Sequence, residues 1–300
     1  MDKKTTVTFI INPISGTHRK DHLPQQIDKL LDHERFEYEV VFTEHRGHAA
    51  EIARQRVADK VDIVVAVGGD GTVNEVARSL VQSQTALGII PCGSGNGLAR
   101  HLCIPMNTKK AIGIINRCQI ESFDYGVING MPFFCTCGMG FDANVSLKFA
   151  QSGKRGLMTY VRNVIKEGLQ YKGETYDITI DDDTTHHQAF LIACANASQY
   201  GNNAYIAPHA TMQDGLMDVV IMQPFSLLKA PMVGASLFMK NIDKKSKVTT
   251  LRAQRIHIHR HAEGAIHYDG DPLVTGADID VHIEHLGIRM LVNPDAKSTL

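Results

Sequence analysis

"VDIVVAVGGDGTVNEVARSL", residues 61–80, contains the change of pattern that decides the fold. Residues 61–67 are mostly apolar and β-branched, which predicts a buried strand. "GGDGT", residues 68–72, then interrupts the apolar run. The apolar positions that follow have the spacing of one helix face: Val73, Val76, Ala77, Leu80 and Val81. A strand, a glycine-rich loop and a helix in this order are typical of α/β proteins.

The same order of elements occurs four times in about the first 120 residues. Strands are predicted at 7–11, 38–43, 61–67 and 87–90, and each is followed by a polar or glycine-rich loop and a helix pattern. This alternation predicts a doubly wound α/β domain, with a parallel sheet and helices on both faces. The loops at the carboxyl ends of the strands hold the ligand in such sheets, so we expect all four loops to gather on one edge.

After about residue 123 the pattern changes to strands joined by turns. Asn129-Gly130 predicts a hairpin turn, and further strands are expected in 176–195, 217–222, 248–260 and 265–286. Helices are predicted at 156–170 and 226–240. We therefore predict an α/β domain at 1–122 and a β-rich antiparallel sandwich or barrel domain at 123–290. Residues 291–300 are expected to pack back on the first domain.

Composition excludes several classes of protein. Lysine plus arginine is 31 and aspartate plus glutamate is 32, so no nucleic-acid-binding charge is present. No apolar segment approaches the roughly 18 residues that span a bilayer, and the first apolar run is too short for a signal sequence, so a cytoplasmic protein is expected. Six cysteines without a C-x-x-C pair indicate reduced thiols, and Cys135 and Cys137 have strand spacing that favours packing.

The loop "GGDGT" has the features of a phosphate site. Gly68 and Gly69 let a ligand approach the backbone, and the helix that follows offers unpaired N–H groups and a partial positive charge. Asp70 lies where a phosphate would bind, and a Mg²⁺ ion between the two would remove this repulsion. The alternative is a tight turn in which Asp70 caps the helix that follows.

Two other loops, "NPISG" at 12–16 and "PCGSGNG" at 91–97, follow strands in the same way. Each could be a simple helix cap, but three such loops on one edge favour a nucleotide phosphate site. Thr43 ends another strand and could reach the same phosphates. No Walker A motif occurs and no lysine lies in these loops, so charge neutralisation is assigned to Mg²⁺, backbone dipoles and a nearby arginine such as Arg100.

The motifs "NPISG", "GGDGTVNEV", "PCGSGN", "GMGFDANV", "DGLMD" and "DGD" occur in this order. Together they resemble the diacylglycerol kinase catalytic-domain family, which contains soluble bacterial lipid kinases and is related to the sphingosine kinases. The resemblance implies that ATP binds in a cleft between the two domains. Together with the loop residues argued above, it makes these the candidate nucleotide-binding residues: Asn12, Pro13, Ser15, Gly16, Thr43, Gly69, Asp70, Gly71, Thr72, Asn74, Glu75, Gly93, Ser94 and Asn96.

The resemblance also implies metal and catalytic positions. Asp271 matches the position of the catalytic base, which is commonly glutamate in the family. A second, structural Mg²⁺ is implied at "QDGLMD", with the Asp214 carboxylate and backbone oxygens near Thr211 and Leu216. An Asp-Gly turn before a strand explains the same residues without a metal. The predicted catalytic residues are thus Asp70 and Asp271, and the predicted metal-site residues are Asp70, Thr211, Asp214, Leu216 and Asp271.

The acceptor is expected to contact the β-rich domain. Sphingosine kinases have an acidic residue at the position of Asn144, so its absence favours a neutral glycerolipid such as diacylglycerol. Apolar residues at 157–165 could line an acyl pocket or could be core. Likewise, 226–240 could be an interfacial helix, although a core helix is favoured. Transient membrane contact is expected, and a homodimer is possible.

Three alternatives stay open at this point. They are a sphingoid-base kinase, an NAD kinase, which carries a similar "GGDGT" loop, and a non-catalytic lipid-binding regulator on the same fold. The intact Asp70 and Asp271 favour an enzyme. Elsewhere, His257, His259 and His261 alternate on one predicted strand, and a polar solvent face is favoured there over a metal site.

Overall fold

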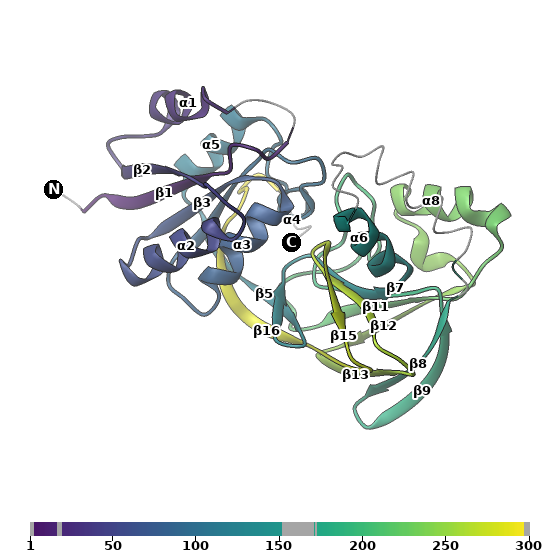
Figure 1. The fold of residues 1–300 in the computed structure, drawn as a ribbon. Coiled ribbons are helices and arrows are strands. Elements are labelled where there is room, and N and C mark those ends of the chain that lie inside the picture. The colour runs from purple at the N-terminus through teal and green to yellow at the C-terminus, as the bar shows by residue number, and fades with distance from the viewer. Residues whose placement is uncertain (1–2, 17–19, 152–170, 172, 297–300) are drawn as a thin grey trace. The chain divides into compact units, whose positions relative to one another are not determined.

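The computed structural model describes residues 3–16, 20–151, 171 and 173–296. The chain forms two compact units (Figure 1). The first unit contains the residues up to Asp124 together with those from His285 onward, and the second unit is Tyr125–Glu284. The chain passes between the units in two strands, β5 (Ile120–Ile128) and β16 (Asp278–Leu291).

The first unit has a parallel sheet in the order β2-β1-β3-β4, and the end of β16 extends it through a parallel pair of Met290 with Leu87. All six residues of the central strand β3 are buried, as its apolar sequence predicts. The four predicted strands are confirmed as β1 (Thr5–Ile11), β2 (Phe36–Phe42), β3 (Ile63–Gly68) and β4 (Ala86–Pro91).

Helices cover both faces of this sheet, with α1 and α5 on one face and α2 and α3 on the other (Figure 1). The predicted doubly wound α/β fold is therefore confirmed. Helix α5 was not predicted, although its buried residues Ala111, Ile112, Ile114 and Ile115 have helical spacing. The helices are α1 (Leu23–Leu30), α2 (His48–Ala58), α3 (Asp70–Leu80), α4 (Gly97–His101) and α5 (Thr108–Arg117).

The second unit is the predicted β-sandwich, built from antiparallel pairs. One sheet has the order β12-β11-β10-β7-β14-β15, and the other contains β16, β13, β8 and β9 with β5 and β6. The new strands are β6 (Met131–Phe133), β7 (Thr136–Gly140), β8 (Glu174–Ile180), β9 (Asp183–Ala189), β10 (Leu191–Ala195), β11 (Met217–Met222), β12 (Val248–Ala253), β13 (Arg255–Arg260), β14 (Gly264–Tyr268) and β15 (Asp271–Thr275).

Strand β10 shows why this unit has two hydrophobic layers. Ile192 and Cys194 belong to the buried cluster between the sheets, whereas Leu191, Ala193 and Ala195 belong to a second cluster on the opposite face. Alternation of side chains along a strand explains this division, and both faces must be covered. The second cluster includes Phe141 at the start of α6 (Phe141–Gln151) and residues of α8 (Ala230–Phe238). Short 3₁₀ helices precede and follow α8, η1 (Leu227–Lys229) and η2 (Ile242–Lys244).

Two expectations about helices in this unit have different outcomes. The helix predicted at 156–170, with its apolar residues at 157–165, lies outside the described residues. The segment 226–240 is helical, but its assignment to the core is wrong for part of its apolar surface. Val233 and Leu237 pack against the second cluster, while Leu228 and Met232 are exposed, because only one face of a helix can contact the sheet.

Other features follow the sequence. The turn at Asn129-Gly130 has φ angles of 45° and 81°, as a tight hairpin requires. All six cysteines are free thiols. His257 and His259 are about half exposed. They contact Asp280 and Asp278, respectively, on the neighbouring strand β16, which is consistent with a polar face. Among the described residues, no helix is long and apolar enough to cross a membrane.

Candidate active site

Hydrogen bonds join the four loops that follow β1 to β4, at the carboxyl ends of these strands. The Asn12 side-chain amide donates to Thr72 Oγ1 at 3.0 Å, which ties the first loop to the third. The backbone N–H of Gly47 donates to Glu75 Oε1 at 3.0 Å, which ties the second loop to α3. The predicted gathering of these loops on one edge of the sheet is thus present.

Close glycine packing joins the same loops. A Cβ atom on Gly16, whose φ is +72°, would lie 2.0 Å from the Cys92 carbonyl oxygen, and one on Gly93 would lie 2.5 Å from Gly69 Cα. These glycines therefore let the loops touch one another. Gly71 differs, because it is exposed and a Cβ there would meet nothing within 4 Å. Space for a ligand at the start of α3 is found at Gly71.

Asp70 is the first residue of α3, but its carboxylate does not cap that helix. Asp70 Oδ2 accepts the N–H of Asn96 at 2.8 Å, and Oδ1 accepts the N–H of Gly97 at 2.7 Å, where α4 begins. Asp70 thus fixes the fourth loop against the third. Each carboxylate oxygen has a second lone pair, and Asp70 is half-buried, so this geometry fits a magnesium ion reached directly or through water. Its role as a magnesium organiser stays a prediction.

Lys20 is a charged residue that the sequence reasoning missed. It is only 5% exposed, and its Nζ donates to the Asn12 carbonyl oxygen at 2.7 Å and to both the carbonyl oxygen and Oγ of Ser15. Burial lowers the pKa of this ammonium. A positive charge therefore lies against the first loop, although no lysine is part of it. No local sequence pattern marks this lysine, because it lies outside the glycine-rich motif.

The remaining predicted nucleotide residues lie in the same four loops or in the first six residues of α3. Thr43, Thr72, Asn74 and Asn96 are buried, whereas Pro13 and Ser94 are exposed. Arg100 Nε donates to the Gly95 carbonyl oxygen at 3.0 Å, so this arginine supports the fourth loop. The structure brings these residues together, and their nucleotide contacts stay predictions.

In the second unit, the two aspartates of "DGD" have different surroundings. The Asp269 carboxylate accepts three backbone N–H groups, from Phe134 at 2.8 Å, Cys135 at 2.7 Å and Thr136 at 3.1 Å. Asp269 therefore stabilises the β14–β15 hairpin. Asp271 begins β15 and is half-buried. Its role as the catalytic base stays a prediction.

Asp214, the predicted ligand of a structural magnesium, has a cationic partner from the chain itself. Arg252 Nη2 contacts Asp214 Oδ2, and Arg252 Nε lies 3.6 Å from Asp218 Oδ1. The other oxygen, Asp214 Oδ1, accepts the Leu216 N–H at 3.1 Å in a tight turn. Arg252 thus supplies the positive charge at Asp214 Oδ2, and the magnesium site at Thr211, Asp214 and Leu216 stays a prediction.

Asn144 and the nearby Asp142 lie at the start of α6, where an acceptor amine would be recognised, and both side chains are hydrogen-bonded within the protein. The Asn144 side-chain amide donates to the Gly140 carbonyl oxygen at 2.9 Å. Asp142 is 9% exposed and lies 3.0 Å from both the Tyr200 hydroxyl and His267 Nε2. Its other oxygen accepts the Ala143 N–H. A buried carboxylate with three protein partners offers little to a ligand ammonium.

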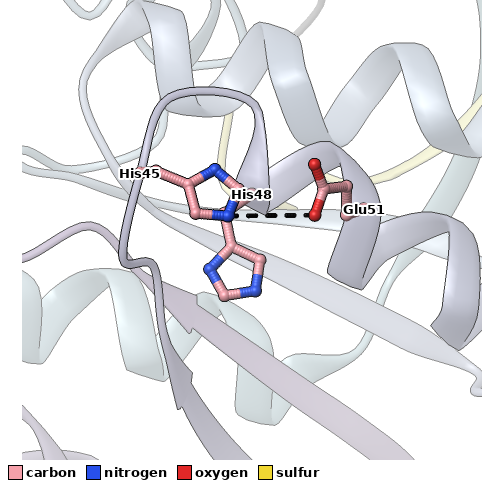
Figure 2. Close-up of side chains that lie close together, drawn as sticks. All are labelled: His45, His48 and Glu51. Atoms are coloured by element: carbon pink, nitrogen blue, oxygen red, sulfur yellow. Dashed lines mark ion pairs between the residues drawn. The ribbon is translucent and has the colours of Figure 1, made fainter.

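Among the described residues, one further group has metal-ligand side chains close together: His45, His48 and Glu51 in the second loop and α2 (Figure 2). The imidazoles stack with centroids 4.6 Å apart, and His45 Nε2 lies 4.0 Å from Glu51 Oε2. His48 Nδ1, however, accepts the Glu44 N–H at 3.0 Å, which leaves the ring proton on Nε2. In this tautomer His48 cannot bind a metal, so the group is not a formed metal site.

An α/β unit with four linked loops around "GGDGT", and a β-sandwich unit, define a class of phosphotransferases. Comparison with known families agrees with this class. Residues 6–128 match the family described as diacylglycerol kinase catalytic domain, and residues 135–292 match the YegS C-terminal NAD kinase beta sandwich-like domain. The chain belongs to the diacylglycerol kinase catalytic-domain family and is a lipid kinase.

Individual relatives cover most of the chain. It is 25% identical over 270 residues to the diacylglycerol kinase of Bacillus subtilis, covering 88% of each protein. It is 27% identical over 260 residues to the diacylglycerol kinase of Mycobacterium tuberculosis, covering 84% of each. A crystal structure of a diacylglycerol kinase from Bacillus anthracis matches with a TM-score of 0.75 and 21% identity over 98% of this chain and 99% of that chain. The last similarity supports the fold.

Proposed function

We propose that this lipid kinase transfers the γ-phosphoryl group of ATP, with Mg²⁺, to the hydroxyl group of a neutral glycerolipid such as diacylglycerol. The observation that carries the phosphate half of this proposal is the linked loop edge of the first unit. Three of its loops are bonded through Asn12, Thr72 and Asp70, and Gly71 leaves the start of α3 open. Such preorganised backbone N–H groups suit the phosphates of a nucleotide.

The reaction assigns separate tasks to the residues. The acceptor oxygen forms a bond to the γ-phosphorus while the bond from that phosphorus to the bridging oxygen of ADP breaks, and Asp271 accepts the hydroxyl proton. A bound Mg²⁺ would neutralise the phosphate oxygens, and Asp70 is the side chain that would hold it. The loop amides position the phosphates, and the buried Lys20 adds positive charge beside the first loop.

The choice of a neutral acceptor is supported by the second unit. A sphingoid base carries an ammonium group and needs a carboxylate to pair with it. Position 144 is an amide that donates to the Gly140 carbonyl oxygen at the end of β7, and the nearby Asp142 is buried with Tyr200 and His267 as partners. Neither position supplies an available carboxylate, which favours a hydroxyl acceptor without a charge.

One experiment tests the whole proposal. Purified protein is given labelled ATP and Mg²⁺ with diacylglycerol, phosphatidylglycerol, sphinganine, a polyprenol or NAD, each in detergent micelles or solution. We expect label in the diacylglycerol product. Preference for sphinganine would overturn the neutral acceptor, label in NAD would overturn the lipid acceptor, and lipid binding without transfer would support a regulator. A parallel reaction with EDTA tests the metal requirement.

A further inference from the structure

The segment from η1 to the end of α8 exposes large apolar side chains. Leu228 is 93% exposed, Met232 59%, Phe238 61% and Met239 69%. These four residues, here named the α8 apolar surface, lie within 12 residues of chain. They are four of the ten exposed large apolar side chains among the described residues. Scattered apolar residues need no explanation, but a concentration of this kind indicates an interaction surface.

This surface belongs to a helix that is anchored on its other face. Val233 and Leu237 pack against the cluster on the outer face of β10 and β11, and the Tyr205 N–H donates to the Leu237 carbonyl oxygen at 2.9 Å. Met232 and Met239 are seven residues apart, so they share the opposite face. A helix on the surface of a globular unit normally presents polar residues to water. Helix α8 instead presents apolar residues on both faces.

Lysines flank the α8 apolar surface along the chain. Residues 224–248 contain five lysines and one acidic residue, Asp243, which lies 3.7 Å from His209. The segment therefore has a net charge of +4, while the other residues have 26 basic and 31 acidic side chains (31 − 5 and 32 − 1), a net charge of −5. The near-zero charge of the whole chain hides this basic segment. The lysines are Lys229, Lys240, Lys244, Lys245 and Lys247.

We propose that the α8 apolar surface docks the kinase on an anionic lipid bilayer. Apolar side chains of an interfacial helix enter the boundary between headgroups and acyl chains, while flanking lysines attract anionic headgroups. Nine residues are too few for α8 to span a bilayer, so it lies in the plane of the interface. A second copy of the chain is a poorer occupant, since a symmetric contact would place two segments of charge +4 together.

The biological purpose of this docking rests on the proposed lipid substrate. The docking itself can be measured without ATP or turnover. The chain contains no tryptophan, so Phe238→Trp provides a single fluorescent reporter in the full protein. Phe42→Trp, at a residue 40% exposed in the first unit, is the matched control. With vesicles of phosphatidylglycerol and phosphatidylcholine, we expect the Phe238→Trp variant to show a blue shift of its tryptophan emission and quenching by acyl-brominated lipid. The control should show neither change.

Substitutions then test which side chains contribute. In vesicle sedimentation, Leu228→Gln combined with Met232→Gln should weaken binding about tenfold or more, from the loss of buried apolar area. Val274→Gln, at an apolar residue 52% exposed on β15, should leave binding unchanged. Lys229→Gln should weaken binding to anionic vesicles by roughly fivefold.

Two results would overturn the docking proposal. One is equal emission shifts for the two tryptophan variants. The other concerns the variant that combines Leu228→Gln with Met232→Gln. If this variant binds vesicles as well as the original chain but no longer self-associates in light scattering, the surface binds a second copy of the chain. Vesicle binding that persists in a protein without diacylglycerol phosphorylation would instead reject only the proposed function.

Discussion

The loop edge of the first unit and the candidate positions of the second unit are held in place by different kinds of contact. In the first unit, some candidate residues bond to a residue of another glycine-rich motif. Asp70 bonds to the loop of Asn96, and Asn12 bonds to Thr72. In the second unit, some candidate positions have their charged or polar partners outside the motifs. Asp214 contacts Arg252, and Asp142 contacts His267.

The difference reflects what each region binds. Phosphate groups have one geometry, so a few glycines, amides and one carboxylate can form a site that short motifs encode. A lipid acceptor is recognised through side-chain pockets and surfaces whose partners come from several strands. Four sets of substitutions test this difference, and they follow in order of decreasing expected effect.

The largest effect is expected on turnover. Asp271→Asn should lower kcat by roughly 10²–10⁴-fold, because the proton acceptor is lost. Asp70→Asn should lower activity to a similar extent and also destabilise the protein by about 1–3 kcal/mol, because two N–H groups at the start of α4 lose a charged acceptor. Turnover assays measure the loss of activity of both variants, and thermal unfolding measures the loss of stability of Asp70→Asn. Near-normal activity of either variant would remove that residue from the mechanism.

A second effect is expected from acid. Burial lowers the pKa of His101, which is only 5% exposed in α4, to about 4. In the unfolded chain, this imidazole binds a proton near pH 6.5, whereas in the folded chain it stays neutral until about pH 4. The free energy of unfolding is therefore unaffected by this group above pH 6.5 and decreases as the pH falls toward 4. The loss should be about 3 kcal/mol.

Urea unfolding at pH 7, 5.5 and 4 measures this loss, and His101→Leu is the comparison. The variant should show a smaller dependence of the free energy of unfolding on pH in this interval. Identical pH dependence for the two proteins would mean that His101 does not control the acid sensitivity of the first unit.

Glycine contacts between the loops should have a smaller effect. Gly93→Ala places a Cβ 2.5 Å from Gly69 Cα and should destabilise the protein by about 1–3 kcal/mol and weaken ATP binding, since the backbone must shift. Gly113→Ala is the control in helix α5, where a Cβ meets nothing within 4 Å. It should stabilise the protein by up to about 1 kcal/mol. Equal effects of both would argue against preorganisation by glycine packing.

The smallest effect concerns the cation at Asp214. Arg252→Gln should destabilise the protein by about 1 kcal/mol, because the pair is partly exposed and screened by solvent. Burial raises the pKa of Asp218, and the Arg252 charge opposes this shift. Thermal unfolding with and without millimolar Mg²⁺ should show that the metal stabilises the variant more than the original chain. Equal stabilisation would mean that arginine and metal do not compete.

Sequence patterns predicted the elements with strong local signals. Strands β1 to β4 and the hairpin at Asn129-Gly130 were predicted because apolar runs and turn residues specify them within a few positions. Helix α5 was missed although Asn107 caps it by accepting the Lys110 N–H. Its short apolar pattern directly follows α4, so it was not separated from that helix. Helix α6 was missed because its first residues continue the glycine-rich end of β7.

The candidate site also has a part that could be predicted from the sequence and a part that could not. The loops after β1 and β3, and the importance of Asp70, could be predicted because spacing and residue type carry that chemistry. The N–H groups that donate to the Asp70 carboxylate and the buried position of Lys20 could not be predicted. Both depend on which loops lie beside each other once the sheet has formed.

By itself, the sequence determined a parallel α/β unit, a β-sandwich unit and a phosphate site around "GGDGT", because hydrophobic periodicity and glycine placement act over short distances. Tertiary structure decided that Asp70 caps α4, that Arg252 is the cation at Asp214, and that the outer face of α8 is exposed. The physical reason is that partner choice and burial are set by packing between distant segments, which no local pattern records.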